Sequence, residues 1–271
     1  MTEPRGLVFG GTGRLGSALR RADPSLIAPG RAALDLEGAS RDDIVEAVSG
    51  AAWVINAAAA AGVDDCERDP VGAHRINAEA PERIARACRA AGVDFLHIST
   101  DYVFGGRRGP YAEGAAPCPV QAYGRSKAGG EAAVLAAGGA VARVSWLFDD
   151  DGGPFQRWVL GQTGPAVEIH TDQRSRPTPL PGLARWLLAV ADRLPDAPRI
   201  LHAAGGPPAS RAQWARAILD ARGRSNPVVP QRSTPLARRP NDSVLDPTAT
   251  DAWADGAGVP RIPDWRDLVG G

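Results

Sequence analysis

The feature that most constrains the fold is an alternation of short apolar runs with longer Ala/Arg-rich segments over the first 150 residues. The apolar runs have the length of buried strands, and the segments between them have the spacing of amphipathic helices. We predict strands at 6–10, 25–29, 51–58, 94–100 and 140–148, and helices at 14–22, 40–49, 71–91 and 124–137. Such β-α alternation predicts an α/β protein with a doubly wound parallel sheet.

Beyond residue 150, Pro and Gly punctuate the chain and separate single helices at 181–193 and 210–222. One more strand-like run, 199–206, fits the edge of the first sheet. We therefore predict a second, smaller domain that is interleaved with the first. The expected division is 1–150 and 178–208 for the first domain, and 151–177 and 209–271 for the second.

Composition excludes several classes of function. The 31 acidic and 31 basic side chains balance to zero net charge, so neither a nucleic-acid partner nor a membrane surface is expected. Three cysteines without C-x-x-C spacing and four separated histidines predict reduced thiols and no metal site. No apolar run approaches the roughly 20 residues that span a bilayer. A cytoplasmic protein, monomeric or homodimeric, is expected.

A glycine-rich turn follows the first predicted strand. Gly10, Gly13 and Gly16 have G-x-x-G-x-x-G spacing between the strand 6–10 and the helix 14–22. Glycine permits a tight turn and a close approach to a pyrophosphate, whose charge the helix N-terminus favours. The context predicts a Rossmann-type dinucleotide site, so the first domain is expected to bind the dinucleotide and the second domain the substrate.

The end of the second predicted strand indicates which dinucleotide binds. NAD-binding folds usually carry an acid there for the ribose hydroxyls, whereas this chain has Arg31. A planar cation suits a 2′-phosphate, so NADPH is favoured and NADH stays possible. Arg31 as a solvated loop residue is the alternative. Asp35 is placed near the adenine, with a simple turn role as the alternative.

Tyr123 and Lys127 are four residues apart at the start of a predicted helix, so both project from one face. Lys127 is the only lysine among 31 cationic side chains, and it follows a tyrosine at this spacing. A compact ammonium can contact ribose hydroxyls beside a phenol where a guanidinium fits poorly. Proton transfer from a phenol near neutral pH requires its pKa to fall by about three units from about 10, and a neighbouring ammonium together with a nicotinamide cation could supply this shift. The alternative is an ordinary exposed helix lysine.

Thr100 ends the fourth predicted strand. Ligands of open α/β sheets bind at the carboxyl ends of strands, where a hydroxyl can hydrogen-bond a substrate carbonyl together with Tyr123. A strand-ending "ST" pair taken alone is usually a cap or turn, so its assignment depends on the other two residues.

The chain resembles the dTDP-4-dehydrorhamnose reductase family of the extended short-chain dehydrogenase/reductase superfamily. The segments that carry the resemblance run nearly end to end: "GGTGRLG", "VINAAAAAGVDDCE", "INAEAPERIARAC", "ISTDYVFGG", "PYAEGAAPCPVQAYGRSKAGGE", "RVSWLF", "TDQRSRPT" and "TPLARRPNDSVLD". The Y-x-x-x-K pair belongs to the whole superfamily, whereas "STDYVF" with "SWLF", "DQ…PT" and "ARRP" is more specific to the sugar reductases.

The resemblance implies a catalytic set of Thr100, Tyr123 and Lys127, in which Tyr123 is the general acid while hydride arrives from the nicotinamide. It implies a reduced 4-keto-6-deoxy sugar on a thymidine diphosphate as product. Substrate contacts are then expected from Val63, Tyr102 and Trp146. Dinucleotide contacts are expected from Gly10, Thr12, Gly13, Arg14, Leu15, Gly16, Arg31, Asp35, Leu36, Ala57, Ala58, Ala59, Tyr123 and Lys127.

Two departures from the family pattern concern the substrate. Ala60 and Ala61 stand where an aromatic or His followed by Thr is usual, which removes a hydroxyl near the expected sugar. Arg174, Ser175 and Arg176 replace an apolar residue, a Gly and a small residue, and they could add contacts to a nucleotide diphosphate.

Two other functions remain open on the sequence. An epimerase or dehydratase of the same superfamily would keep the catalytic set and retain NAD tightly. A regulatory subunit would bind a dinucleotide without turnover.

Overall fold

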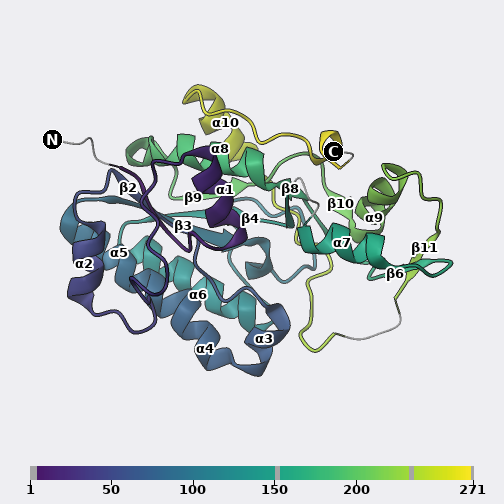
Figure 1. Cartoon of the computed structure of the whole chain (residues 1–271), viewed down its shortest axis with the longest axis horizontal. Helices are drawn as coiled ribbons and strands as arrows, with labels where there is room; N and C mark the ends of the chain where they lie inside the picture. The colour runs from purple at the N-terminus through teal and green to yellow at the C-terminus, as the bar shows by residue number, and fades with distance from the viewer. Residues whose placement is uncertain (1–4, 150–152, 232–234, 270–271) are drawn as a thin grey trace.

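The computed structural model describes residues 5–149, 153–231 and 235–269 (Figure 1). Within these ranges the largest sheet has five strands in the order β1-β2-β3-β4-β9, and every neighbouring pair is parallel. Its strands are β1 (Leu7–Phe9), β2 (Trp53–Asn56), β3 (Asp94–Thr100), β4 (Ala140–Val144) and β9 (Ile200–Ala203). The expected α/β fold with a doubly wound parallel sheet is confirmed.

The strand order reverses next to β1. After β1 the chain first returns on one side, where Ile27 forms a single parallel bridge with Leu7, and then crosses to β2 on the other side. The carboxyl ends of β1 and β2 therefore flank a topological switch point, where ligands of such sheets bind. The predicted strand 25–29 was wrong in extent, because prolines at both ends, Pro24 and Pro29, lack the N–H that a longer ladder requires.

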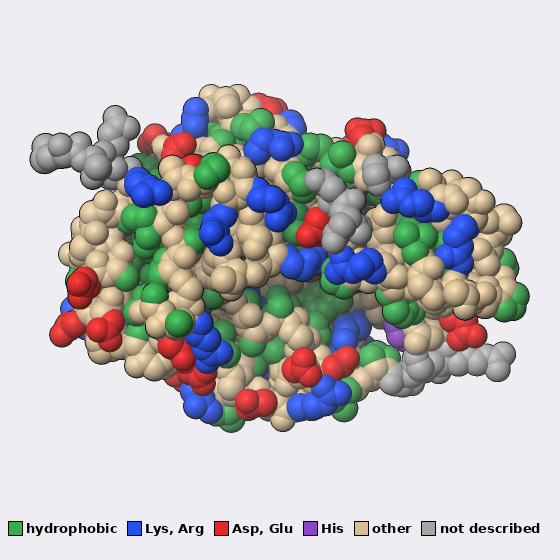
Figure 2. All heavy atoms as spheres, in the orientation of Figure 1, with side chains coloured by type: hydrophobic (Ala, Val, Ile, Leu, Met, Phe, Trp, Pro, Cys, Tyr) green, Lys and Arg blue, Asp and Glu red, His purple; other side chains and the backbone are tan. Residues whose placement is uncertain are grey.

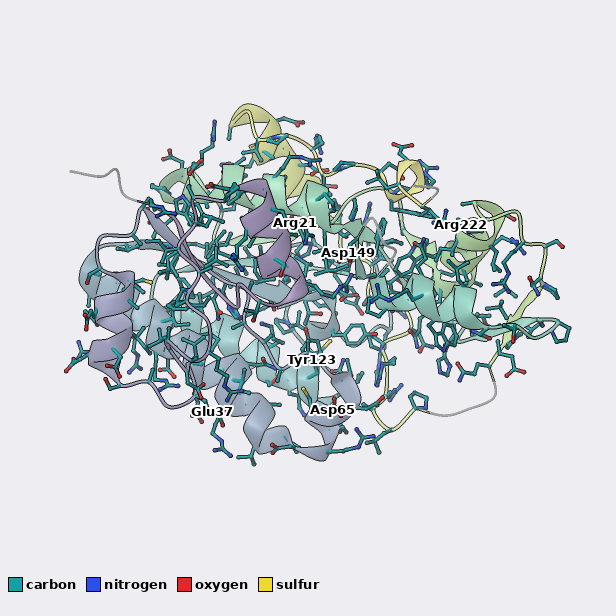
Figure 3. The ribbon with its side chains drawn as sticks, viewed as in Figure 1. Arg21, Glu37, Asp65, Tyr123, Asp149 and Arg222 are labelled. Carbon is teal, nitrogen blue, oxygen red and sulfur yellow. The ribbon has the colours of Figure 1, made fainter. Side chains whose placement is uncertain are left out.

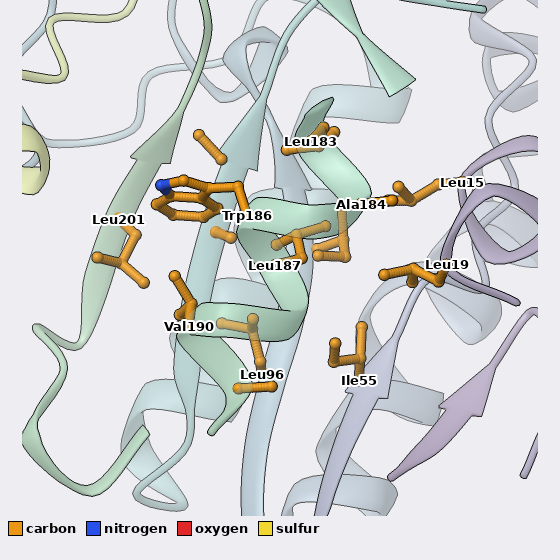
Figure 4. Close-up of a cluster of buried hydrophobic side chains, with 14 of the residues drawn as sticks. Leu15, Leu19, Ile55, Leu96, Leu183, Ala184, Trp186, Leu187, Val190 and Leu201 are labelled. Carbon is orange, nitrogen blue, oxygen red and sulfur yellow. The ribbon is translucent and has the colours of Figure 1, made fainter. Parts of the chain in front are cut away.

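Helices cover both faces of the sheet (Figure 1). One face carries α1 (Arg14–Ala22), α8 (Leu180–Ala191) and α10 (Thr248–Gly256), and the other carries α2 (Arg41–Val48), α5 (Ala80–Ala91) and α6 (Ala122–Ala136). Figure 4 shows the first of the two cores, in which leucines of α1 and α8 pack on Ile55, Leu96 and Leu201 of the sheet. Burial of apolar surface on both faces fixes the parallel sheet as the central layer.

The remaining sequence predictions were correct in type and less so in extent. The helix 71–91 is α4 (Pro70–His74), a π-helical turn η1 (Arg75–Glu79) and α5 in succession. The short helix α3 (Val63–Arg68) was not predicted. The run 140–148 divides into β4 and β5 (Leu147–Phe148), because Trp146 has a positive φ of 39° and turns the chain between them.

A third cluster of buried apolar residues lies beyond the sheet and includes Phe148, Val159, Val167, Trp214 and Trp265. None of the described helices has the length and apolar character needed to cross a bilayer. The division of the chain at residues 150, 177 and 208 stays a prediction. Ala254 of α10, which was assigned to the second domain, packs in the same core as α8 of the first domain. The other elements are η2 (Asp101–Val103), α7 (Gly153–Gly161), β6 (Val167–Ile169), β7 (Arg174–Ser175), β8 (Thr178–Pro179), η3 (Leu194–Asp196), β10 (Ala209–Ser210), α9 (Arg211–Asp220), β11 (Val228–Pro230) and η4 (Trp265–Asp267).

Candidate active site

The glycine turn between β1 and α1 lies against the chain that leaves β2. Gly10 has a φ of 80°, and a Cβ there would lie 2.5 Å from the backbone nitrogen of Ala58. A Cβ at Gly16 would collide with the carbonyl oxygen of Gly10. Glycine is therefore required at both positions, which leaves the backbone and the α1 N-terminus open to a pyrophosphate.

A cavity of ≈ 200 Å³ adjoins this turn. It joins residues that follow β1, the bridge at Ile27 and β2, which are the expected places for a dinucleotide at the switch point. The residues that line it fit an adenosine group, because apolar side chains and alanine backbone face a charged rim. Its lining is Phe9, Gly10, Pro29, Arg31, Leu34, Asp35, Leu36, Glu37, Ala58, Ala59, Ile76 and Ala80.

Arg31 lies at the rim of this cavity with its side chain 73 % exposed, and it pairs with two carboxylates, Asp35 at 3.2 Å and Glu37 at 3.2 Å. The pKa of Asp35 is lowered mainly because its carboxylate accepts the backbone N–H of Glu37. Sequence reasoning missed Glu37, which also lies 3.7 Å from Arg75. The cation is thus held at the rim and can exchange its carboxylates for a phosphate.

The other expected dinucleotide contacts are distributed around the turn. Thr12 is exposed on it, whereas the side chain of Leu15 is buried in the core, so only the backbone of Leu15 can face a ligand. Arg14 donates to the carbonyl oxygen of Leu147 at 3.2 Å and pairs with Asp149, which connects the turn to β5. Ala57 continues the contact of β2 with β1 by donating to the Phe9 carbonyl at 2.9 Å.

The three expected catalytic residues come together beside the switch point. Thr100 is the last residue of β3, and it lies close enough to Tyr123, the second residue of α6, for its hydroxyl to lower the pKa of the phenol. Lys127 follows one turn later on α6. Figure 3 shows Tyr123 at the centre of the molecule, between Asp149 and Asp65, and Figure 2 shows the surface hollowed there between α7 above and α3 below.

Burial governs the titration of this set. It raises the pKa of Tyr123 above its ordinary value, and the nearby Thr100 hydroxyl opposes the shift. It lowers the pKa of Lys127 to about 8, against the opposing charge of Glu131. The lysine nitrogen donates to the Ile98 carbonyl at 2.6 Å and lies 3.0 Å from Nε2 of His97, so β3 holds it in place.

The expected substrate residues come from three separate parts of the chain, and one of them, Tyr102, contacts Tyr123. Val63 begins α3, and the ring of Tyr102 in η2 meets that of Tyr123 edge-on at 6.2 Å. Trp146 stacks on Trp214 of α9 at 5.6 Å, and its buried indole N–H has no hydrogen-bond partner among the described residues.

Sequence reasoning missed the cations near these rings. The guanidinium of Arg211 lies 3.8 Å over the ring of Trp146, and it lies close enough to Tyr102 for each to act on the pKa of the other. Arg239 pairs with both carboxylate oxygens of Asp64 at 3.0 Å, and its charge also acts on Tyr102. The motif "ARRP" pointed to Arg239 without giving it a role. No local pattern distinguishes Arg211, because only folding brings α9 to β5.

A buried carboxylate next to Thr100 connects the sheet to the loops beyond it. Asp101 accepts hydrogen bonds from Ser175 at 2.7 Å and Ser243 at 2.5 Å, and from Thr100 at 3.2 Å. Burial raises its pKa to about 6 in spite of these donors. Ser175, which the sequence showed only as a difference from the family pattern, thus has a role as a hydrogen-bond donor to Asp101.

Arg174 and Arg176, which depart from the family pattern, each have a partner within the protein. Arg174 pairs with Asp242 at 3.3 Å, and Arg176 donates to the Leu245 carbonyl at 2.8 Å. Both therefore fasten one loop to another. The backbone of Ala60 is held from both sides by the side-chain amide of Asn77. Across the described ranges, no group of three or more His, Cys, Asp or Glu is arranged to hold a metal ion.

Comparisons with known proteins identify the family of the chain. A family model described as "RmlD substrate binding domain" matches residues 5–270. A probable dTDP-4,6-dihydroxy-2-methyloxan-3-one 4-ketoreductase of Streptomyces antibioticus is 37% identical over 98% of this chain and 93% of its own length. The dTDP-4-dehydrorhamnose reductase of Mycolicibacterium smegmatis is 38% identical over 80% of this chain and 68% of its own.

Among solved structures, the dTDP-4-dehydrorhamnose reductase of Bacillus anthracis in complex with NADP superposes with a TM-score of 0.86 at 25% identity, covering 100% of this chain and 97% of its own. The enzyme of the same name from Yersinia enterocolitica gives 0.86 at 26% identity over 98% and 97%. The chain therefore belongs to the family described by the RmlD substrate binding domain.

Proposed function

We propose that this protein is an NADPH-dependent reductase of the 4-keto group of a nucleotide-linked 6-deoxy sugar, acting in the synthesis of deoxysugar or polysaccharide precursors. The observation that carries the proposal is the meeting of Thr100, Tyr123 and Lys127 at the carboxyl end of β3, beside the glycine turn. The names of the similar reductases supply the substrate class, and the Bacillus anthracis structure supplies the cofactor.

The residues divide the chemistry among them. When bound, the dinucleotide supplies a hydride to the keto carbon. Thr100 and Tyr123 hydrogen-bond the carbonyl oxygen, and Tyr123 gives it a proton as the alkoxide forms. Burial keeps the phenol protonated at neutral pH, and transfer of its proton to the substrate would require this raised pKa to fall once cofactor and substrate are bound. Lys127 orients the ribose and adjusts the acidity of the phenol.

The substrate is proposed to lie between Val63, Tyr102 and Trp146, with its sugar over Tyr123. Arg211 and Arg239 are the cations nearest to Tyr102, and we assign them to the diphosphate. Arg31 is assigned to the 2′-phosphate of NADPH, and NADH remains a weaker alternative. We also propose that the chain has the two interleaved domains predicted from the sequence. The protein would act in the cytoplasm as a monomer or homodimer, without a nucleic-acid partner.

The test is NADPH oxidation against a panel of 4-keto nucleotide sugars, with Tyr123→Phe as the inactive control. Reduction of one panel member, lost by at least about a hundredfold in the variant, is expected from removal of the general acid. If the purified protein carries a stoichiometric amount of bound NAD and oxidises no NADPH with any sugar of the panel, it would instead be an epimerase or dehydratase. Unchanged sugar products in cells that carry Tyr123→Phe would identify a regulatory subunit.

A further inference from the structure

A chain of buried hydrogen bonds connects the lone lysine to the backbone at the dinucleotide cavity. It starts at the Ala58 nitrogen, which donates to Oδ1 of Asn56 at 3.0 Å. Nδ2 of Asn56 lies 3.2 Å from Nδ1 of His97, and Nε2 of His97 lies 3.0 Å from Nζ of Lys127. Asn56, His97 and Lys127 are each no more than 1 % exposed, so water does not replace any of these contacts.

The direction of each hydrogen bond in this chain is fixed at one end. A backbone N–H can only donate, so Asn56 must present its carbonyl oxygen to Ala58 and its NH₂ group to His97. Nδ1 of a neutral His97 is then the acceptor, and its ring proton is on Nε2. That proton points at Nζ of Lys127, which can accept it only as a neutral amine and meanwhile donates to the Ile98 carbonyl.

We propose that Asn56 and His97 are positioning residues that set the protonation state of Lys127, by ordering this hydrogen-bond chain so that the neutral amine is its satisfied form. Protonating Lys127 adds one proton and requires His97 to carry its ring proton on Nδ1. Two donors then face each other, at Asn56 or, if the amide turns over, at Ala58. One buried donor is left without an acceptor, and this opposes the ammonium.

Other charged groups around the lysine act in the opposite direction or are neutralised. On its own helix, Glu131 favours the ammonium, but it is paired with Arg143 of β4 at 2.7 Å. Tyr123 on the same helix is protonated at neutral pH. On the neighbouring α4, His74 is more than half exposed and is paired with Glu79. Burial lowers the pKa of Lys127 to about 8, and the ordered hydrogen bonds oppose the ammonium in addition.

The consequence for catalysis rests on the proposed function, whereas the protonation itself does not. A lysine that titrates close to neutral pH can exchange its proton during turnover, whereas one that stays charged acts only as a fixed cation. Asn56 and His97 would then determine where the rate of reduction changes with pH.

The experiment uses the fact that Lys127 is the only lysine in the sequence. The full chain, without lysine in any tag, is grown with ¹³C-labelled lysine, so one side-chain resonance reports its titration. We expect Lys127 to titrate at least about one pH unit below a solvent lysine. ¹⁵N spectra of the histidine rings, with His97 assigned from His97→Phe, are expected to show its proton on Nε2 above this pKa and on Nδ1 below it.

Asn56→Asp is expected to reverse the direction of the hydrogen bonds from residue 56 through His97 to Lys127, because aspartate has nearly the same shape as asparagine but can only accept. A carboxylate accepts from both Ala58 and Nδ1–H of His97, so that Nε2 accepts from the ammonium, and the pKa of Lys127 is expected to rise by at least about one unit. The matched control is the same substitution in a His97→Phe background, where the charge is kept and the connection is lost. There the rise is expected to be less than half as large.

Three results would overturn the inference: titration of Lys127 at the value of a solvent lysine, a His97 tautomer that is constant with pH, or an equal effect of Asn56→Asp with and without His97. Thermal unfolding checks that each variant is folded. If a variant is not folded, the titration of Lys127 and the tautomer of His97 in the wild-type protein decide whether the inference holds. These measurements need no substrate. If the protein reduces a keto sugar but the pKa of Lys127 does not depend on His97, only this inference is rejected. If the pKa of Lys127 depends on His97 but no keto sugar is reduced, only the proposed function is rejected.

Discussion

Single side chains in this site are tuned chiefly by removal from water. Burial raises the pKa of Tyr123 and lowers that of Lys127, and both shifts favour the neutral forms of the two groups. The sequence alone led us to expect an ammonium that lowers the pKa of the phenol. The structure instead places the lysine nitrogen against His97 and the Ile98 carbonyl, where its charge is disfavoured.

Lys127→Arg is expected to lower kcat at least about tenfold, as in other disturbances of an acid–base element. The reason is that a guanidinium is wider than an ammonium and keeps its charge in a site built for a group that titrates near pH 8. Steady-state NADPH oxidation measures the effect. Arg125→Lys, an exposed exchange on the same helix, is the control and should behave as wild type; equal kcat for both variants would make the lone lysine incidental.

Arg31→Ala is expected to lower the preference for NADPH over NADH about tenfold, which corresponds to one charge-assisted hydrogen bond of roughly 1.4 kcal/mol. Asp35 and Glu37 would remain at the rim of the cavity and repel a 2′-phosphate. The ratio of kcat/KM for the two cofactors measures the preference. Arg86→Ala, which removes an exposed cation on α5 paired with Glu82, should leave the ratio unchanged. An unaltered ratio in Arg31→Ala would remove Arg31 from cofactor recognition.

Between elements, the site is held together by buried polar contacts. The end of β3 is joined to β7 and to the segment before α10 through Asp101, Ser175 and Ser243. Because Thr100 precedes Asp101 directly, these contacts also fix where the hydroxyl of Thr100 lies.

Asp101→Asn is expected to change how stability depends on pH. The pKa of Asp101 is about 6 in the folded protein against 3.8 as the ordinary value, so its contribution to the free energy of unfolding is complete below pH 4 and is lost as the pH rises through 6. The loss is about 3 kcal/mol, from about 2 pKa units at 1.36 kcal/mol each. Wild type should therefore lose stability relative to the variant between pH 4 and pH 7.

Urea unfolding at several pH values measures this difference, with Asp220→Asn as a control at an exposed carboxylate. A difference between wild type and Asp101→Asn that does not vary with pH would show that Asp101 titrates as an ordinary aspartate.

At the scale of the whole molecule, the dinucleotide cavity joins the segments that follow β1, the bridge at Ile27 and β2. A ligand that binds these segments only when they are folded should stabilise the protein. NADP⁺ at about a hundred times its Kd is expected to add about 2.7 kcal/mol, or about 5–10 °C in Tm.

Thermal unfolding with NADP⁺ and with NAD⁺ at equal concentration measures this effect, and NAD⁺ should raise Tm less. In Arg31→Ala the two dinucleotides should give similar shifts. A protein whose Tm ignores both would not bind a dinucleotide at this cavity.

The sequence by itself determined the layers of the fold, because a parallel sheet buried on both faces requires apolar runs that alternate with amphipathic helices. It also indicated the glycine turn and the Tyr123–Lys127 pair, because each lies within one local element whose geometry follows from its spacing. Thr100 could be added because parallel strands place their carboxyl ends on one edge. The short helix α3 and the extent of 25–29 were missed, because too few residues were available to show a period.

Only the tertiary structure decided which distant residues adjust this site. His97 is 30 positions from Lys127 and Asn56 is 41 positions from His97, and Arg211 reaches Trp146 from another helix. No periodicity records such contacts, since they arise when separate strands and helices pack. The direction of a hydrogen bond or the pKa of a buried amine depends on those neighbours and on the exclusion of water, and both exist only in the folded chain.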